Sequence, residues 1–327
     1  MFDLISIGDA TIDNFVQIHD AEVRCSLNKQ DCKLCIDYGD KISVDKLTHL
    51  VAGNAANNAV GGARLKLNSA IYVNIGEDPS GKQILDKFKE ESVSTRYVVV
   101  NKGMESNLST VINFQGERTI LVYHQAWKYA LPDLDRTKWV YFTSVSKSFT
   151  QSDIVSQLIQ YLKRTGARLL YNPGTYQIEA GVKKSPQLLS LTTVFIVNKD
   201  EAKNILGFKE NEDVNIKKLL KRLCDLGPKM TIITDGEEGS YGFDGEKYYQ
   251  IGIFPAKLLE MTGAGDGYAT GVLAGFFYGK SLSEAMRWGA ANGAAVVEQI
   301  GPQAGLLTYE KMQDKLKEHA KVMAKEI

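Results

Sequence analysis

The stretch TTVFIVNKDEAKNILG, residues 192–207, decides the fold class of this 327-residue chain. TTVFIVN is a short apolar run, which predicts a buried strand of a parallel sheet. KDEAKNILG follows it directly with helical spacing, and Gly207 is a typical end for a helix. A strand followed at once by a helix is the repeating unit of a parallel sheet that helices cover on both faces.

The same unit recurs along the chain. Similar apolar runs, each closed by polar or glycine residues, lie at 2–8, 69–76, 138–144, 167–174 and 229–236. Helical patterns lie at 53–67, 80–92, 153–166, 214–227, 264–278, 283–299 and 308–325. We therefore predict an α/β protein with a Rossmann-like, three-layer αβα domain and a mostly parallel sheet.

Two β-rich segments interrupt this alternation. Residues 15–50 are polar and irregular, and residues 95–123 contain two β-rich runs around the turn signal Gln115–Glu117. We expect 15–50 and 95–123 to form a small, discontinuous β-sheet lid. Residues 1–14, 51–94 and 124–327 then form the α/β domain that binds nucleotide and substrate.

The charge balance limits the classes of partner. Lys plus Arg and Asp plus Glu both number 39, so no basic excess indicates nucleic acid. The apolar stretch at the N-terminus is too short for a signal peptide, and no run reaches the roughly 18 apolar residues of a membrane helix. These features predict a soluble cytoplasmic protein without a nucleic-acid or membrane partner.

The sequence GAGD at 263–266 opens a long apolar helix. Glycine and alanine let the backbone N–H groups of Gly263, Ala264 and Gly265 approach an anion, and a helix N-terminus favours negative charge there. An acid beside such a nest repels a bound phosphate. Asp266 makes chemical sense if it takes a proton from an attacking hydroxyl while the nest holds the transferring phosphoryl group.

The same glycines also suit tight helix packing. Small residues continue along the helix at Gly271, Ala274 and Gly275. Asp266 would then be an ordinary acid in a first helical turn. We expect both interpretations to hold, with the start of the helix reactive and the later small residues packed.

Polar residues follow the predicted strands, where ligands bind in open α/β sheets. Asp9, Asp13, Gly53 and Asn57 suit a polyol, because carboxylates accept hydrogen bonds from adjacent hydroxyls and asparagine both gives and accepts them. The alternative is that they are caps and turns. Arg118 would contact an anionic substrate group or be a solvated turn residue.

Asn198 and Glu201 follow the strand at 192–198. Glu201 could hold Mg²⁺ through water, since Mg²⁺ keeps several of its waters in proteins. Alternatively, the two residues cap the next helix.

Three cysteines cluster at Cys25, Cys32 and Cys35. Their spacing raises the possibility of a zinc or redox site, with His19 or His49 as a fourth ligand. The alternative is free thiols on a loop or small sheet.

Taken together, these residues resemble the PfkB, or ribokinase-like, carbohydrate kinase family over nearly the whole chain. The family signature D-T-x-G-A-G-D stands here as E-M-T-G-A-G-D, residues 260–266. The remaining motifs are AGNAANNAVGGARL at 52–65, IGED at 75–78, Gly8-Asp9 with Asp13, Asn198 with Glu201, Thr234 with Gly236, and Asn292.

The resemblance implies an ATP- and magnesium-dependent kinase that phosphorylates a sugar or a similar hydroxyl compound. Asp266 is implied as general base, with the 263–265 amides as anion hole. Asp13, Gly53 and Asn57 are implied to hold the acceptor.

The nucleotide side of the site follows from the same resemblance. Asn198 and Glu201 are implied to help place magnesium and the phosphates. Thr234, Gly236 and Asn292 are implied to lie near the nucleotide. The family lid also predicts a possible homodimer through the β-sheet lid.

The chain departs from the family pattern at Glu260 and Met261. Glu260 replaces an Asp that helps some members to bind an activating potassium ion, so it is a candidate monovalent-cation ligand. The 15–50 segment is longer than in compact members, so the acceptor does not follow by analogy.

Other functions remain open. A nucleoside kinase of the same family would bind the same diol, on the ribose of the nucleoside. Trp127, Phe15 or Tyr123 could then stack on the base. A non-catalytic binding protein could retain the fold. A dinucleotide oxidoreductase is disfavoured, because GDATIDN after the first strand lacks two glycines of the dinucleotide fingerprint.

Overall fold

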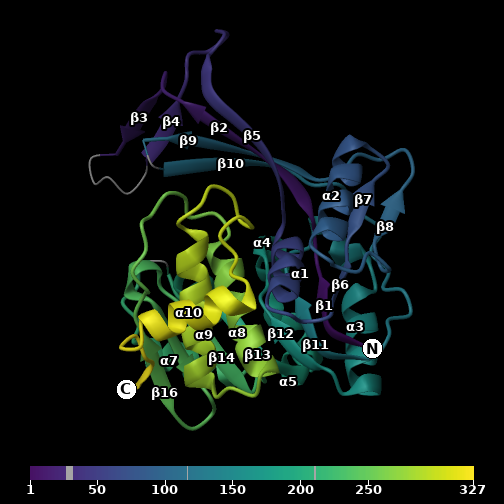
Figure 1. The fold of residues 1–327 in the computed structure, drawn as a ribbon, viewed down its shortest axis with the longest axis vertical. Coiled ribbons are helices and arrows are strands. Elements are labelled where there is room, and N and C mark those ends of the chain that lie inside the picture. Colours follow the sequence, from purple (N-terminus) through teal and green to yellow (C-terminus); the bar gives the residue numbers. More distant parts are fainter. Residues whose placement is uncertain (27–31, 116, 210) are drawn as a thin grey trace.

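The computed structural model describes residues 1–26, 32–115, 117–209 and 211–327. Figure 1 shows a main body with a large sheet between helices, and a small sheet that stands beyond it at the top of the view. The predicted α/β class with a mostly parallel sheet and a second, smaller sheet is confirmed.

The large sheet has the strand order β17-β16-β15-β14-β13-β12-β11-β1-β6. Neighbours from β6 to β14 run parallel, whereas β14 to β17 are joined by antiparallel pairings. The strands are β1 (Phe2–Ile7), β6 (Ser69–Tyr72), β11 (Thr137–Phe142), β12 (Arg168–Tyr171), β13 (Thr192–Asn198), β14 (Met230–Thr234), β15 (Ser240–Phe243), β16 (Tyr248–Ile251) and β17 (Lys325–Glu326). The last helix ends at Glu318, and the final strand begins at Lys325, so the helix predicted over 308–325 is shorter than expected.

Helices cover both faces of this sheet. They are α1 (Asn54–Arg64), α2 (Pro79–Glu90), α3 (Ile154–Thr165), α4 (Thr175–Ala180), α5 (Pro186–Leu191), α6 (Lys199–Leu206), α7 (Ile216–Cys224), α8 (Ala264–Phe277), α9 (Leu282–Val296) and α10 (Tyr309–Glu318), with 3-10 turns at Lys147–Gln151, Val182–Lys184 and Gly236–Glu238. Within the described ranges, no helix combines the length and apolar composition needed to cross a membrane.

Successive residues of the central strands point to opposite faces, as strand geometry requires. Leu4 and Trp139 pack in the core beneath α8 and α9, whereas Ile5 and Val140 pack in the core beneath α3, α5 and α7. Because both faces are buried, these strands appear in the sequence as continuous apolar runs rather than as alternating ones.

The small sheet has the order β10-β9-β2-β5. Its strands are β2 (Thr11–Ile18), β5 (Val44–Ala52), β9 (Leu108–Phe114) and β10 (Glu117–Tyr123). It therefore begins before residue 15 and includes only the second half of 95–123. The strand β8 (Val99–Asn101) pairs instead with β7 (Asn74–Gly76), beside α2 in Figure 1. The division of the chain into two domains stays a prediction.

Cys25, Cys32 and Cys35 lie on the antiparallel strands β3 (Glu22–Cys25) and β4 (Cys32–Cys35). Cys25 and Cys32 form a disulfide, with Cα atoms 4.0 Å apart, and Cys35 is free. The predicted zinc site is not supported, because the disulfide removes two of its three thiolate ligands. Across the described residues, no group of three or more His, Cys, Asp or Glu side chains could hold a metal ion.

Candidate active site

Asp266 lies in the first turn of α8, one of the helices that cover the large sheet. Gly263 caps this helix with a φ of 84°, a left-handed conformation that favours glycine. A Cβ at this position would lie 2.3 Å from the Cβ of Pro302, so both the backbone angle and the close approach require glycine. The Ala264 N–H donates to the Met261 carbonyl at 3.2 Å, which closes the turn ahead of Asp266.

The Asp266 carboxylate is held by two amides from α1. Asn54 Nδ2 donates to Oδ1 at 2.9 Å, and Asn57 Nδ2 donates to Oδ2 at 2.8 Å. Asn58 donates in turn to the Thr270 hydroxyl at 3.0 Å. Positions 54, 57 and 58 share one helix face, so the repeat N-x-x-N-N places three amides along α8.

Burial tunes the acidity of Asp266. The side chain is 7% exposed, and desolvation raises its pKa to about 6, while the two amide donors work in the opposite direction. A carboxylate with a pKa near 6 is largely ionised at neutral pH and is still a better proton acceptor than an ordinary aspartate. Asp266 therefore has the properties that a general base needs.

Asp9 and Asp13 are buried on the segment that leads from β1 into the small sheet. Burial raises the pKa of each carboxyl to about 7, and for Asp13 the nearby charges of Asp266 and Glu260 add to the effect. Tyr129 donates to Asp9 Oδ1 at 2.6 Å. No described residue hydrogen-bonds Asp9 Oδ2 or Asp13 Oδ1, so two buried acceptors remain for hydroxyl groups of a ligand.

Gly53 joins the small sheet to α1. Its φ is 101°, and a Cβ there would lie 2.6 Å from the Asp9 carbonyl oxygen. Only glycine allows this approach, which brings the start of α1, and hence Asn57, beside the Asp9–Asp13 segment.

Three of the predicted nucleotide residues, Asn198, Thr234 and Gly236, lie at or just after the carboxyl ends of two neighbouring strands. Asn198 of β13 pairs in register with Thr234 of β14. Asn198 Oδ1 accepts from the Glu201 N–H, and Glu201 Oε2 accepts from the Asn198 N–H, both at 2.8 Å. The structure thus shows that Asn198 and Glu201 cap α6, which is one of the two alternatives that the sequence gives. Space is free around Gly236, where an added Cβ meets nothing within 4 Å.

Asn292 has a packing role in this structure. Its side chain has no exposed area, its Nδ2 donates to the Gly267 carbonyl at 2.7 Å, and its Oδ1 accepts from the Leu307 N–H at 3.0 Å. The amide joins α9 to α8 and to the following loop. Both polar groups of the side chain are used in these contacts, and the predicted position of Asn292 near the nucleotide stays a prediction.

Glu260, in the segment before α8, lies beside Arg118 of the small sheet. Glu260 is 8% exposed, accepts from the Thr262 N–H at 2.7 Å and lies 3.7 Å from an Arg118 nitrogen. Arg118 comes from β10 of the small sheet, so a fixed positive charge already lies beside the candidate potassium ligand. Met261 is half exposed and is not part of this contact.

The aromatic residues considered for base stacking differ in exposure. Trp127, in the loop between β10 and β11, and Phe15, in β2, are 1% and 3% exposed, so they are buried residues rather than stacking surfaces. Tyr123 lies exposed on β10, with its hydroxyl 3.4 Å from Glu105.

The chain is similar in sequence to known kinases. The sequence profile of the pfkB family carbohydrate kinases matches residues 14–308. The chain belongs to this family. An ATP-dependent 6-phosphofructokinase from Thermoanaerobacterium thermosaccharolyticum is 27% identical over 282 residues, which cover 81% of this chain and 84% of the relative.

Solved structures give the same fold for this pfkB family member. The ribokinase of Arabidopsis thaliana, complexed with ribose and ATP, superimposes with a TM-score of 0.79 at 23% identity, covering 97% of this chain and 99% of the other. The nucleoside kinase of Burkholderia thailandensis, in complex with inosine, has a TM-score of 0.76 at 18% identity, covering 97% and 99%.

In this pfkB family kinase, sequence reasoning missed two polar residues of the network around Asp266. Asn54 donates directly to Asp266, and Gln303 Nε2 donates to Asn57 Oδ1 at 3.1 Å. The i, i+3, i+4 spacing of asparagines on α1 could have indicated Asn54. No local signal points to Gln303, because its partner lies 246 residues earlier in the chain.

Proposed function

We propose that this chain transfers the γ-phosphoryl group of ATP to a hydroxyl of a sugar, with Asp266 as general base. One observation supports this most strongly: a buried carboxylate with a raised pKa, fixed by two amides, lies in the first turn of a helix. Family membership supplies the reaction class, and the buried acids Asp9 and Asp13 supply acceptors for sugar hydroxyls.

The reaction follows from these positions. The acceptor binds with hydroxyls on the free oxygens of Asp9 and Asp13, beside Gly53 and Asn57. Asp266 removes the proton of the attacking hydroxyl as its oxygen bonds to the γ-phosphorus, while the bond from that phosphorus to the bridging oxygen breaks and ADP leaves. The backbone amides at the start of α8, among residues 263–265, stabilise charge on the phosphoryl oxygens, because they are oriented before the reaction begins.

Magnesium and nucleotide would lie at the carboxyl ends of β13 and β14. Mg²⁺ needs only one or two protein carboxylates besides phosphates and water, and Glu201 is the candidate carboxylate here. Glu201 would hold it through water, and the bound ion would neutralise phosphate charge. Thr234 and Gly236 would border the phosphates.

A nucleoside kinase is the second candidate. The likeness to the inosine-bound kinase favours it. The burial of Trp127 and Phe15 counts against it, because a base would need an exposed aromatic face and, of the three aromatic residues considered, only Tyr123 offers one. The likeness to a 6-phosphofructokinase makes sugar phosphates a further acceptor class, for which Arg118 is the candidate anion contact.

The test is an ADP-release assay with panels of sugars, sugar phosphates and nucleosides, each with and without Mg²⁺. Asp266→Asn should lower kcat about 10²–10⁴-fold with the best acceptor while ADP affinity stays unchanged. An unchanged kcat would refute the role of Asp266 as base. ATP turnover that no acceptor increases would refute the kinase assignment and favour a binding protein.

A further inference from the structure

Only the NH₂ end of the Asn57 amide can hydrogen-bond the Asp266 carboxylate. An ionised carboxylate accepts hydrogen bonds and cannot donate them, so Asn57 must present its Nδ2 group to Asp266. Its Oδ1 then faces the opposite direction, where it accepts from Gln303 Nε2 at 3.1 Å. Both side chains are buried, with 3% and 5% exposure, so water does not replace this partner.

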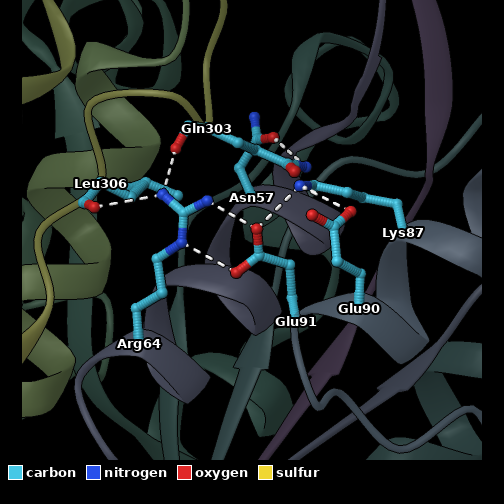
Figure 2. Close-up of polar contacts among 7 residues, drawn as sticks. All are labelled: Asn57, Arg64, Lys87, Glu90, Glu91, Gln303 and Leu306. Carbon is cyan, nitrogen blue, oxygen red and sulfur yellow. Dashed lines mark hydrogen bonds and ion pairs between the residues drawn. The ribbon is translucent and has the colours of Figure 1, made fainter.

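The backbone of Gln303 is fixed from the other side by Arg64, the last residue of α1. Figure 2 shows the Arg64 guanidinium between the Glu91 carboxylate and the carbonyl oxygens of Gln303 and Leu306. The hydrogen bonds to these carbonyls are 2.5 and 3.2 Å, and those to Glu91 are 2.9 and 2.6 Å. Lys87 adds an ion pair to Glu91 at 2.8 Å.

The residues ahead of Gln303 contact two other parts of the site. Pro302 packs against Gly263 at the start of α8, and Gly301 lies so close to Leu50 of β5 that an added Cβ would be 2.2 Å away. The segment 301–306 therefore contacts the start of the reactive helix, the amide of Asn57 and the small sheet at once.

We infer that Gln303 is a positioning residue, which fixes the end of the Asn57 amide that faces Asp266. The inference rests on the proposed role of Asp266 as base. Gln303 reaches the carboxylate only through Asn57, so it is not itself catalytic. The Arg64–Glu91 pair holds the Gln303 backbone, and the Gln303 side chain sets the direction of the Asn57 amide.

Reversal of the Asn57 amide would raise the pKa of Asp266. If the Asn57 amide turns over, its carbonyl oxygen faces the carboxylate, which loses a donor and gains a repulsive dipole. The charged or titratable groups that face Asp266 are Asp13 from β2 and Tyr141 from β11, and Glu260 lies beside Asp13. The substitutions at position 303 change none of these residues.

Two variants of Gln303 separate loss of the donor from reversal of the amide. Gln303→Met removes the donor without charge. Gln303→Glu offers an acceptor, so Asn57 should turn its Nδ2 toward Glu and its oxygen toward Asp266. Gln83→Glu is the matched control, because Gln83 is exposed and lines the same cavity of about 570 Å³ as Gln303. It adds the same charge there without reaching Asn57.

The first readout is the titration of the Asp266 carboxyl by ¹³C NMR in the full-length protein, assigned by comparison with Asp266→Asn. We expect Gln303→Glu to raise the pKa by at least about one unit, a tenfold change in the protonation equilibrium, and Gln303→Met to raise it less. Gln83→Glu should leave it unchanged. Equal titrations in wild type and both Gln303 variants would overturn the inference, as would an equal shift in Gln83→Glu.

The second readout is the pH profile of kcat/KM. The acid limb of Gln303→Glu should move upward by the same amount, with recovery toward the wild-type rate at alkaline pH. A uniform loss at every pH would indicate a merely structural role and overturn the inference. The NMR titration needs no turnover, so an absence of kinase activity in the wild type would refute the proposed function separately. If Gln303→Glu does not fold, Gln303→Met decides the question.

Discussion

The contact between α8 and α9 allows a quantitative prediction for Gly271→Ala. A Cβ at Gly271 would lie 2.4 Å from the Trp288 carbonyl oxygen and 2.7 Å from its carbon, both in the backbone of α9. Ordinary van der Waals contact begins near 3.4 Å, so the helices must separate by about 1 Å. A backbone atom cannot avoid the clash by changing rotamer.

The expected loss of stability combines two opposed effects. Overpacking costs about 1–3 kcal/mol, and the rigid backbone contact favours the upper end. Alanine recovers up to about 1 kcal/mol of helix propensity, which leaves a net loss of about 2 kcal/mol. The unfolding entropy of a 327-residue chain is about 0.7 kcal/mol/K at about 2.1 cal/mol/K per residue, so Tm should fall by about 3 °C.

Differential scanning calorimetry measures this shift, and the same helix supplies the control. Gly265→Ala makes the same substitution where an added Cβ meets nothing within 4 Å, so Tm should stay or rise slightly. A Gly271→Ala protein as stable as the wild type would refute the packing argument. Equal losses in both variants would show that the helix, rather than the contact, is sensitive to alanine.

Two further predictions concern the Arg64–Glu91 pair and the small sheet. Arg64, with a smaller contribution from Lys87, holds the pKa of Glu91 at about 2 instead of 4.5, so these ion pairs together contribute up to about 3 kcal/mol above pH 4.5, which is lost as the pH falls from 4.5 through 2. The difference in unfolding free energy between wild type and Glu91→Gln, from urea titrations, should shrink from pH 5 to pH 3, and a constant difference would contradict this. Leu121 is 58% exposed on β10, between exposed Ile120 and Val122, and we expect this strand to join two copies of the chain. Sedimentation should show a dimer that Leu121→Lys converts to a monomer, and a monomeric wild type would refute the interface.

Much of this fold follows from local sequence patterns, because its determinants are local. Apolar runs predict the strands of the large sheet, and their continuity reflects burial on both faces. The small residues after Asp266 predict tight packing, and Gly271 and Gly275 do lie against the α9 backbone. The four-stranded sheet was less predictable, since β8 and β9 are both short β-rich runs and their different partners depend on distant strands.

In the candidate site, too, some residues follow from local sequence motifs and others depend on contacts with distant parts of the chain. Asp266, Asn57 and Gly53 stand in recognisable motifs, and the structure brings them together. The polar residues that fix them do not stand in motifs. Gln303 follows a glycine and a proline in an irregular loop, and only the folded chain shows that its side chain meets Asn57.

The distances along the chain between these partners affect when the site can form during synthesis. Asn57 precedes Asp266 by 209 residues and Gln303 by 246. At about 5–20 residues per second, a ribosome needs about 15–60 s to reach residue 303. Once α1 is made, its buried amides lack the carboxylate until residue 266 is added and the glutamine until residue 303 is added. A chain released before residue 303 therefore lacks this hydrogen-bonded site, however well its first strands have paired.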